Sequence, residues 1–127
     1  MFEHWHDLAI LSHSSPDRLV AEIRVALDSP WFNGHFPGEP ILPGVAVLTM
    51  VVEMVRHAEQ KKNRKVRISG IKRVRFKQPV KPNDQLSIEV SCEDSGPVSS
   101  YLFKAMVKNE IACTGVVLVE RIPAGSV

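Results

Sequence analysis

Alternation of apolar and polar residues predicts most of the β-strands in this chain. Because successive side chains of a strand point to opposite faces, a run with an apolar residue at every second position predicts a half-buried strand. Residues 18–28 follow this pattern, and their apolar face consists of Leu19, Ala21, Ile23, Val25 and Leu27. The same reasoning predicts further strands over residues 71–76, 86–92, 101–107 and 110–120.

Three positions in or beside these strands carry a more specific expectation. Gly70 precedes the 71–76 strand, and we expect it to permit a bulge that shifts the register. Phe76 falls on the apolar face of that strand and is expected to point inward. Ile111 begins the apolar face of the last strand, whose other face is apolar as well. Burial of both faces, by a partner or by the chain's own helix, is therefore expected for the last strand.

A helix is predicted from Pro43 or Gly44 to about Glu59. Apolar residues recur there at helical spacing, at Val45, Leu48, Val52 and Val55. Three more widen the apolar surface beyond one stripe, namely Met50, Val51 and Met54. A helix that is apolar nearly all round is a buried one, so we expect a core helix.

The order of these elements is strand, loop, helix and then four strands in hairpin sequence. One helix against a mostly antiparallel sheet is an α+β architecture. The 127 residues suit a single domain with its own core. Residues 1–16 are an N-terminal segment without a clear pattern, and about residues 122–127 are expected to be a flexible tail.

The loop before the helix is the stretch with the clearest chemical signal. Residues 30–45 contain four of the nine prolines and three of the seven glycines. We therefore expect this loop to have a defined backbone conformation. His35 lies in the middle of this loop. A histidine can serve as a general base near neutral pH. The alternative is a purely structural role, in which His35 stabilises the loop by hydrogen bonds.

Composition narrows the class of protein. With 44% hydrophobic and 24% charged residues, the chain is typical of a globular domain, and no apolar run is long enough for a membrane span. The first residues are acidic and aromatic, unlike a signal peptide. Cys92 and Cys113 lack metal-ligand spacing and are expected to be free thiols, and His4 and His6 have no further ligand nearby. A cytoplasmic protein without a metal or membrane association is expected.

A basic block follows the helix. Ten of the sixteen basic residues lie between Lys61 and Lys81, with no acid among them. Nucleic-acid binding would favour interleaved aromatic residues, but only Phe76 lies in the block, and the net charge is only +2. The block could instead steer an acidic protein partner, or be a solvated face. We do not expect nucleic acid as a partner.

Residues 35–45, His-Phe-Pro-Gly-Glu-Pro-Ile-Leu-Pro-Gly-Val, resemble the signature loop of the 3-hydroxyacyl-thioester dehydratases of fatty acid synthesis. Residues 70–80 and 83–86 resemble the same family at a second, distant place. The resemblance implies a hot-dog fold, in which an antiparallel sheet wraps a central helix. It implies a substrate held as a thioester of acyl carrier protein or coenzyme A. It also implies a homodimer or higher oligomer with the active site at the subunit interface.

The chemistry of dehydration then assigns roles along the loop and helix. His35 is the candidate base that removes the proton beside the thioester carbonyl. Backbone N–H groups at the start of the helix, near Gly44 and Val45, lie at the positive end of the helix dipole and could bind the carbonyl oxygen. The resemblance gives Gly38 or Gly44 that role. The substrate-binding residues that it implies are Phe36, Gly38, Pro43, Gly44 and Val45.

The general acid is the place where the chain departs from the family. The family carries Glu or Asp fourteen residues after the loop histidine, and this chain has Thr49 there. Threonine can at most orient a water. Glu53 lies one turn later and is expected to be buried, which would raise its pKa as an acid catalyst requires. Its alternative is a surface or ion-paired carboxylate.

Three functions remain open from the sequence. The first is an active dehydratase that uses His35 with Glu53 or a water held by Thr49. The second is a related hot-dog protein without dehydratase activity, such as a partner of an active paralogue, a carrier-binding protein or a thioesterase. The third is a nucleic-acid-binding domain. No cofactor is expected, because eliminating water beside a thioester needs none, and we expect Met50, Met54 and Phe103 to set the depth of an acyl tunnel.

Overall fold

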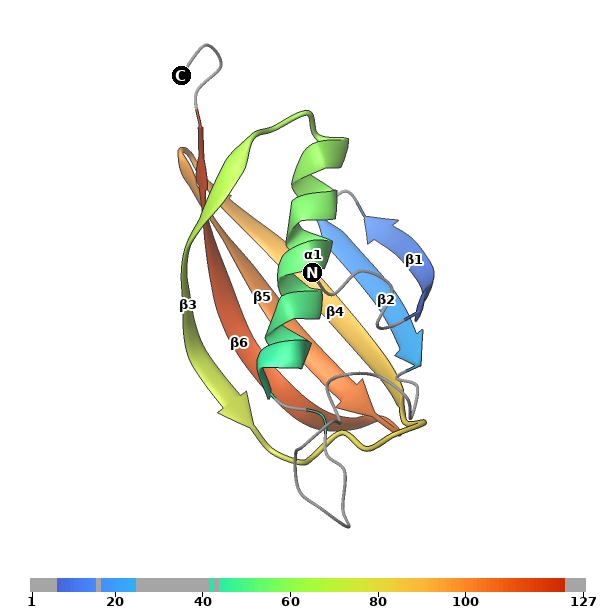
Figure 1. The fold of residues 1–127 in the computed structure, drawn as a ribbon. Coiled ribbons are helices and arrows are strands. Elements are labelled where there is room, and N and C mark those ends of the chain that lie inside the picture. Colours follow the sequence, from blue (N-terminus) through green and yellow to red (C-terminus); the bar gives the residue numbers. More distant parts are fainter. Residues whose placement is uncertain (1–6, 16, 25–41, 43, 123–127) are drawn as a thin grey trace.

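One helix lies across one face of a six-stranded antiparallel sheet (Figure 1). The computed structural model describes residues 7–15, 17–24, 42 and 44–122. The sheet order is β1-β2-β4-β5-β6-β3. The elements are β1 (Asp7–Ser15), β2 (Arg18–Arg24), α1 (Gly44–Lys61), β3 (Val66–Phe76), β4 (Gln85–Ser95), β5 (Val98–Val107) and β6 (Glu110–Arg121).

This arrangement confirms the predicted α+β class and corrects two details of the predicted order. An additional strand, β1, pairs with β2 in the segment that had no clear pattern. β3 does not form a hairpin with β4, because β4 is already paired on both edges, with β2 and β5. β3 therefore takes the free edge of β6. The predicted continuation of the second strand through Val25 and Leu27, and the tail beyond residue 122, lie outside the described residues.

Two register shifts shape β3. The first, between Ile68 and Gly70, is the predicted bulge. The second lies between Lys72 and Arg75, where Arg73 has a φ of 57°, a value that non-glycine residues rarely adopt. Phe76 ends the strand on the side of α1, as predicted, but it is 56% exposed because β3 is an edge strand.

The core lies between α1 and the inner face of β2, β4, β5 and β6. In β6 the prediction for Ile111 is wrong, because that residue is exposed. Opposite it, the pairing of β5 with β6 shifts register between Ala105 and Met106, which moves Ile111 away from the inner face. The buried residues of α1 are Ala46, Val47, Met50, Val51, Met54, Val55 and Glu59.

Burial of α1 on all sides, which the sequence led us to expect, is wrong for the single chain. Val45 is 56% exposed, and Glu53 and Arg56 are exposed as well. One side of the helix therefore has no covering from the described part of the chain. Among the described residues, no helix combines the length and apolar character that crossing a membrane would need.

Candidate functional site

The start of α1 lies beside the end of β3 (Figure 1). Gly44 opens the helix, and the ring of Phe76 rests against its Cα: a Cβ at Gly44 would lie 2.4 Å from Cζ of Phe76. No larger residue fits while the ring keeps this place. The close contact therefore explains why the chain has glycine here, and it brings an exposed aromatic ring to the helix start.

Backbone geometry makes this helix start a place where negative charge can be stabilised. The first amides of a helix have no partner within the helix and point along the positive end of its dipole. The approach to the helix is fixed as well, because the N–H of Leu42 donates to the carbonyl of Val80 at 2.8 Å and both side chains are buried. Gly44 and Val45 are the first two residues of the helix, and their role in binding a carbonyl oxygen stays a prediction.

Thr49 lies one turn further along α1 and is half-buried. Its hydroxyl donates to the carbonyl of Val45 at 2.8 Å. Because this bond uses the only hydroxyl proton, Oγ1 is left with its lone pairs and can accept a hydrogen bond from a water but cannot donate one. Thr49 can therefore hold a water by accepting from it, and it cannot protonate a leaving group.

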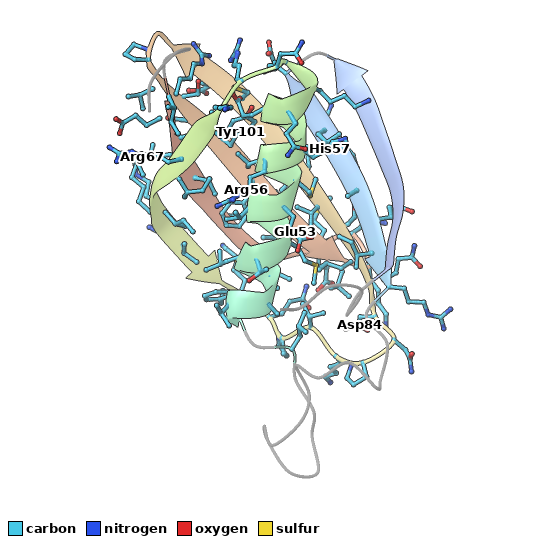
Figure 2. All side chains as sticks on the ribbon, turned by 45° about the horizontal axis from the view of Figure 1, so that its top comes forward. Glu53, Arg56, His57, Arg67, Asp84 and Tyr101 are labelled. Carbon is cyan, nitrogen blue, oxygen red and sulfur yellow. The ribbon has the colours of Figure 1, made fainter. Side chains whose placement is uncertain are left out.

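Glu53 is exposed in the single chain, so the expected burial of its carboxyl is not seen there. It lies on the uncovered side of α1, together with Arg56 (Figure 2). There a groove of about 420 Å3 runs between α1 and β3, and four of its seven lining residues are apolar. We call it the helix groove, and it is lined by Val45, Leu48, Thr49, Val52, Glu53, Arg56 and Ile71.

The structure thus brings Val45, Thr49 and Glu53 together along one groove. His35, Phe36, Gly38 and Pro43 lie outside the described residues, and their roles stay predictions. Met50, Met54 and Phe103 were expected to set a tunnel depth, but all three are buried in the core and none lines the helix groove.

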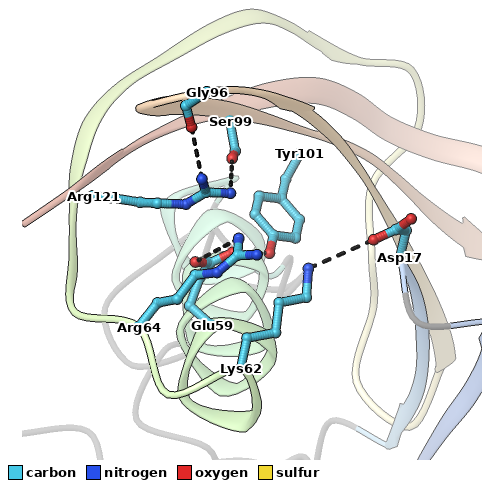
Figure 3. A network of polar contacts seen from close by, with 8 residues as sticks. All are labelled: Asp17, Glu59, Lys62, Arg64, Gly96, Ser99, Tyr101 and Arg121. Carbon is cyan, nitrogen blue, oxygen red and sulfur yellow. Dashed lines mark hydrogen bonds and ion pairs between the residues drawn. The ribbon is translucent and has the colours of Figure 1, made fainter.

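A second polar cluster, which the sequence did not suggest, lies at the opposite end of α1 (Figure 3). Glu59 is 1% exposed, accepts a hydrogen bond from the hydroxyl of Tyr101, and lies 3.7 Å from Nη1 of Arg64. Burial, and then the bond to Glu59, raise the pKa of Tyr101 far above its ordinary value. The signal was available, because Glu59 follows the buried Val55 by four residues and so continues the buried stripe.

Neither cysteine is placed for catalysis or for metal binding. Cys92 and Cys113 are free thiols, and burial raises the pKa of Cys113 to about 11, which keeps it protonated near neutral pH. Among the described residues, no group of three or more His, Cys, Asp and Glu side chains could hold a metal ion.

The comparisons with known proteins identify the class of protein. The family model of the ApeI-like proteins, described as ApeI dehydratase, matches residues 11–116. A FabZ 3-hydroxyacyl-[acyl-carrier-protein] dehydratase of Haemophilus influenzae is 33% identical over 118 residues, which cover 88% of this chain and 80% of that protein. The FabZ dehydratase of Bacillus pumilus is 36% identical over 109 residues, which cover 82% and 76% of the two chains.

Solved structures agree on the fold. The dehydratase heterocomplex ApeI:P from Xenorhabdus doucetiae has a TM-score of 0.70 at 22% identity, covering 89% of this chain and 96% of that one. A hypothetical thioesterase with coenzyme A from Streptococcus pneumoniae has a TM-score of 0.75 at 11% identity, covering 95% and 88%. These likenesses confirm the hot-dog fold. The chain belongs to the ApeI-like dehydratase family and is a dehydratase-like protein.

Proposed function

We propose that the chain eliminates water from a 3-hydroxyacyl thioester carried by acyl carrier protein and releases the 2-enoyl thioester. The observation that supports this best is the start of α1 at Gly44, with Val45, the second helical residue, lining the helix groove. The carbonyl oxygen of the thioester binds these amides, and the acyl chain lies along the apolar part of the groove. His35 takes the proton from the carbon beside the carbonyl, and an enolate-like charge develops on the oxygen.

The leaving hydroxyl needs a proton to depart as water, and Thr49 cannot supply it directly. Thr49 accepts a hydrogen bond from a water, which passes a proton to the departing hydroxyl. The hydroxide left behind takes up the proton that His35 removed from the substrate. Glu53 is the second candidate, since it lines the same groove one turn further on. Phe36, Gly38 and Pro43 complete the thioester site from the loop. No cofactor takes part in this elimination.

The active unit in this proposal is a homodimer or a higher oligomer. Three apolar side chains are exposed along α1 and β3 near the site: Val45 and Phe76 at 56% and Ile71 at 39%. β3 is also an edge strand. Val52→Lys, on the uncovered side of α1, should shift the chain toward monomer in light scattering, whereas Lys65→Glu at the far end of β3 should not. An unchanged oligomer would contradict this part of the proposal.

A cytoplasmic location is part of the proposal and is supported by the two free thiols, which suit a reducing compartment. The second candidate function is that of a non-catalytic subunit beside an active paralogue, or a carrier-binding protein. Thr49 at the usual acid position favours it. One of the similar solved structures is a dehydratase heterocomplex, and this motivates a test of such pairing.

Turnover of a 3-hydroxyacyl thioester by wild type and five variants tests the proposal. His35→Ala should abolish turnover, and Thr49→Val should lower kcat while Thr49→Ser retains it. Loss in Glu53→Gln rather than in Thr49→Val would assign the acid to Glu53. Thr49→Glu would install the family's acid and should raise kcat, since a positioned general acid contributes roughly 10²–10⁴-fold. No turnover by wild type on several chain lengths and carriers would favour the non-catalytic subunit.

A further inference from the structure

The face of the sheet that points away from α1 carries a second groove of about 470 Å3. Leu102 and Lys104 line it from β5, where they alternate with the buried Tyr101 and Phe103. Thr114 and Val116 contribute from β6, opposite Lys104 and Leu102. We call it the outer groove, and its lining is Arg73, Arg75, Glu89, Ser91, Leu102, Phe103, Lys104, Thr114, Gly115 and Val116.

One wall of the outer groove is cationic because of the second bulge of β3. The register shift between Lys72 and Arg75, with Arg73 at a φ of 57°, inserts one extra residue, so that Arg75 lies opposite Thr114 on the outer face. Arg73 and Arg75 both line the groove. Bulges of this kind re-aim side chains, and strained backbone is retained where the surroundings require it. Within the described part of the chain, no acid forms an ion pair with Arg73, Arg75 or Lys104.

The floor of the outer groove favours a protein over a nucleic acid. Leu102 is 43% exposed although it lies in the middle of an interior strand. Phe103, the aromatic residue of the lining, is buried and offers no face for stacking bases. The wall opposite β3 carries Glu89, which forms an ion pair with Arg18. Cations beside an exposed leucine instead suit an acidic surface that also presents apolar side chains.

The outer groove and the candidate site lie on opposite faces of the sheet and come together at the end of β3. Arg75 lines the groove, and the next residue, Phe76, rests on Gly44 at the start of α1. We propose that the outer groove docks the acidic, amphipathic surface of the carrier protein that delivers the thioester. Arg73 and Arg75 attract it, and Leu102 packs against its apolar residues. This inference rests on the proposed function and adds the surface by which the substrate arrives.

Charge reversal in the outer groove tests the inference. Arg75→Glu and Arg73→Asp reverse charge, and aspartate tolerates the left-handed backbone at position 73. Each variant should lower kcat/KM for an acyl carrier protein thioester by roughly tenfold or more at low salt, as expected for loss of electrostatic steering. The same acyl group on a small pantetheine thioester should be turned over unchanged. Lys65→Glu makes an equal charge change at the other end of β3 and should leave both substrates unaffected.

Equal loss on the carrier and on the small thioester would overturn the inference, as would loss with Lys65→Glu or no loss at all. If wild type turns over neither substrate, the proposed function fails and docking is judged by calorimetric titration with an unreactive acyl carrier protein. In that titration, weaker binding by Arg75→Glu and by Leu102→Ser supports the outer groove, and unchanged binding refutes it. Arginine-dependent binding of a single-stranded oligonucleotide, with carrier binding unchanged, would refute it too.

Discussion

Replacing Gly44 by alanine would put a methyl group where the ring of Phe76 already lies. The new Cβ would be 2.4 Å from Cζ and 2.6 Å from Cε1, so the ring has to move. Overpacking of this kind costs about 1–3 kcal/mol, and alanine returns up to about 1 kcal/mol through its helix propensity. Because the exposed ring can swing toward water, we expect Gly44→Ala to lower the free energy of unfolding by only about 1 kcal/mol.

A double-mutant cycle with Phe76→Leu isolates this contact. Leucine lacks the Cζ and Cε atoms that meet the new methyl group. In the Phe76→Leu background, Gly44→Ala should therefore be neutral or slightly stabilising. The interaction free energy, measured by urea denaturation of the four proteins, should reach about 1 kcal/mol. Effects that add within about 0.3–0.5 kcal/mol would refute the contact between the ring and the helix start.

Two other glycines serve as controls for the same substitution. At Gly70 the nearest atom to a new Cβ is 3.7 Å away, so Gly70→Ala should change stability little. At Gly115 the new Cβ would lie 2.6 Å from Cε2 of Phe103, a buried ring that has nowhere to move. Gly115→Ala should therefore cost more than Gly44→Ala. The order Gly115, Gly44, Gly70 follows from the mobility of the neighbouring atoms.

Three further predictions concern the buried polar and thiol groups. Glu59→Gln removes the charge beside Arg64 and should cost about 1–3 kcal/mol in urea denaturation, less than for a fully buried pair because Arg64 reaches water. Tyr101→Phe leaves a buried carboxylate oxygen of Glu59 without its donor and should cost about 1–3 kcal/mol. The pKa of Cys113, raised from 9.0 to about 11, favours the folded state below pH 9, and this stability is lost between pH 9 and 11. The urea midpoint should fall more steeply over that range in wild type than in Cys113→Ala.

Apart from β1, the strands and the helix followed from the sequence because their side chains obey simple periods. β2, β4 and β5 alternate without interruption, and α1 begins at Gly44 as the pattern indicated. The place of β3 could not be read in the same way. Its pairing with β6 depends on which strand edges remain free once the other hairpins have formed, and local periodicity carries no information about that.

In the candidate site, too, the sequence located some residues correctly and others not. Gly44, Val45 and Thr49 were placed by motif and helical spacing, and the structure puts the last two on one groove. The buried acid of α1 is Glu59, whereas burial was expected for Glu53. Both lie on α1, but Glu59 continues the stripe that faces the sheet, whereas Glu53 faces away from it. A single acidic residue in an apolar helix is buried only if it lies on the face that packs against the sheet.

α1 carries more apolar surface than the single chain buries. Val45 and Val52 line the uncovered helix groove with Ile71 of β3, and the exposed ring of Phe76 lies against Gly44 at the start of α1. Apolar surface of this kind at the start of a helix is costly in water, and covering it would also exclude water from the amides of Gly44 and Val45. Donors in a water-excluded site stabilise an oxyanion far more strongly than donors in solvent. The requirement for a covering chain and the requirement for catalysis therefore fall on the same surface, so association and activity should be lost together.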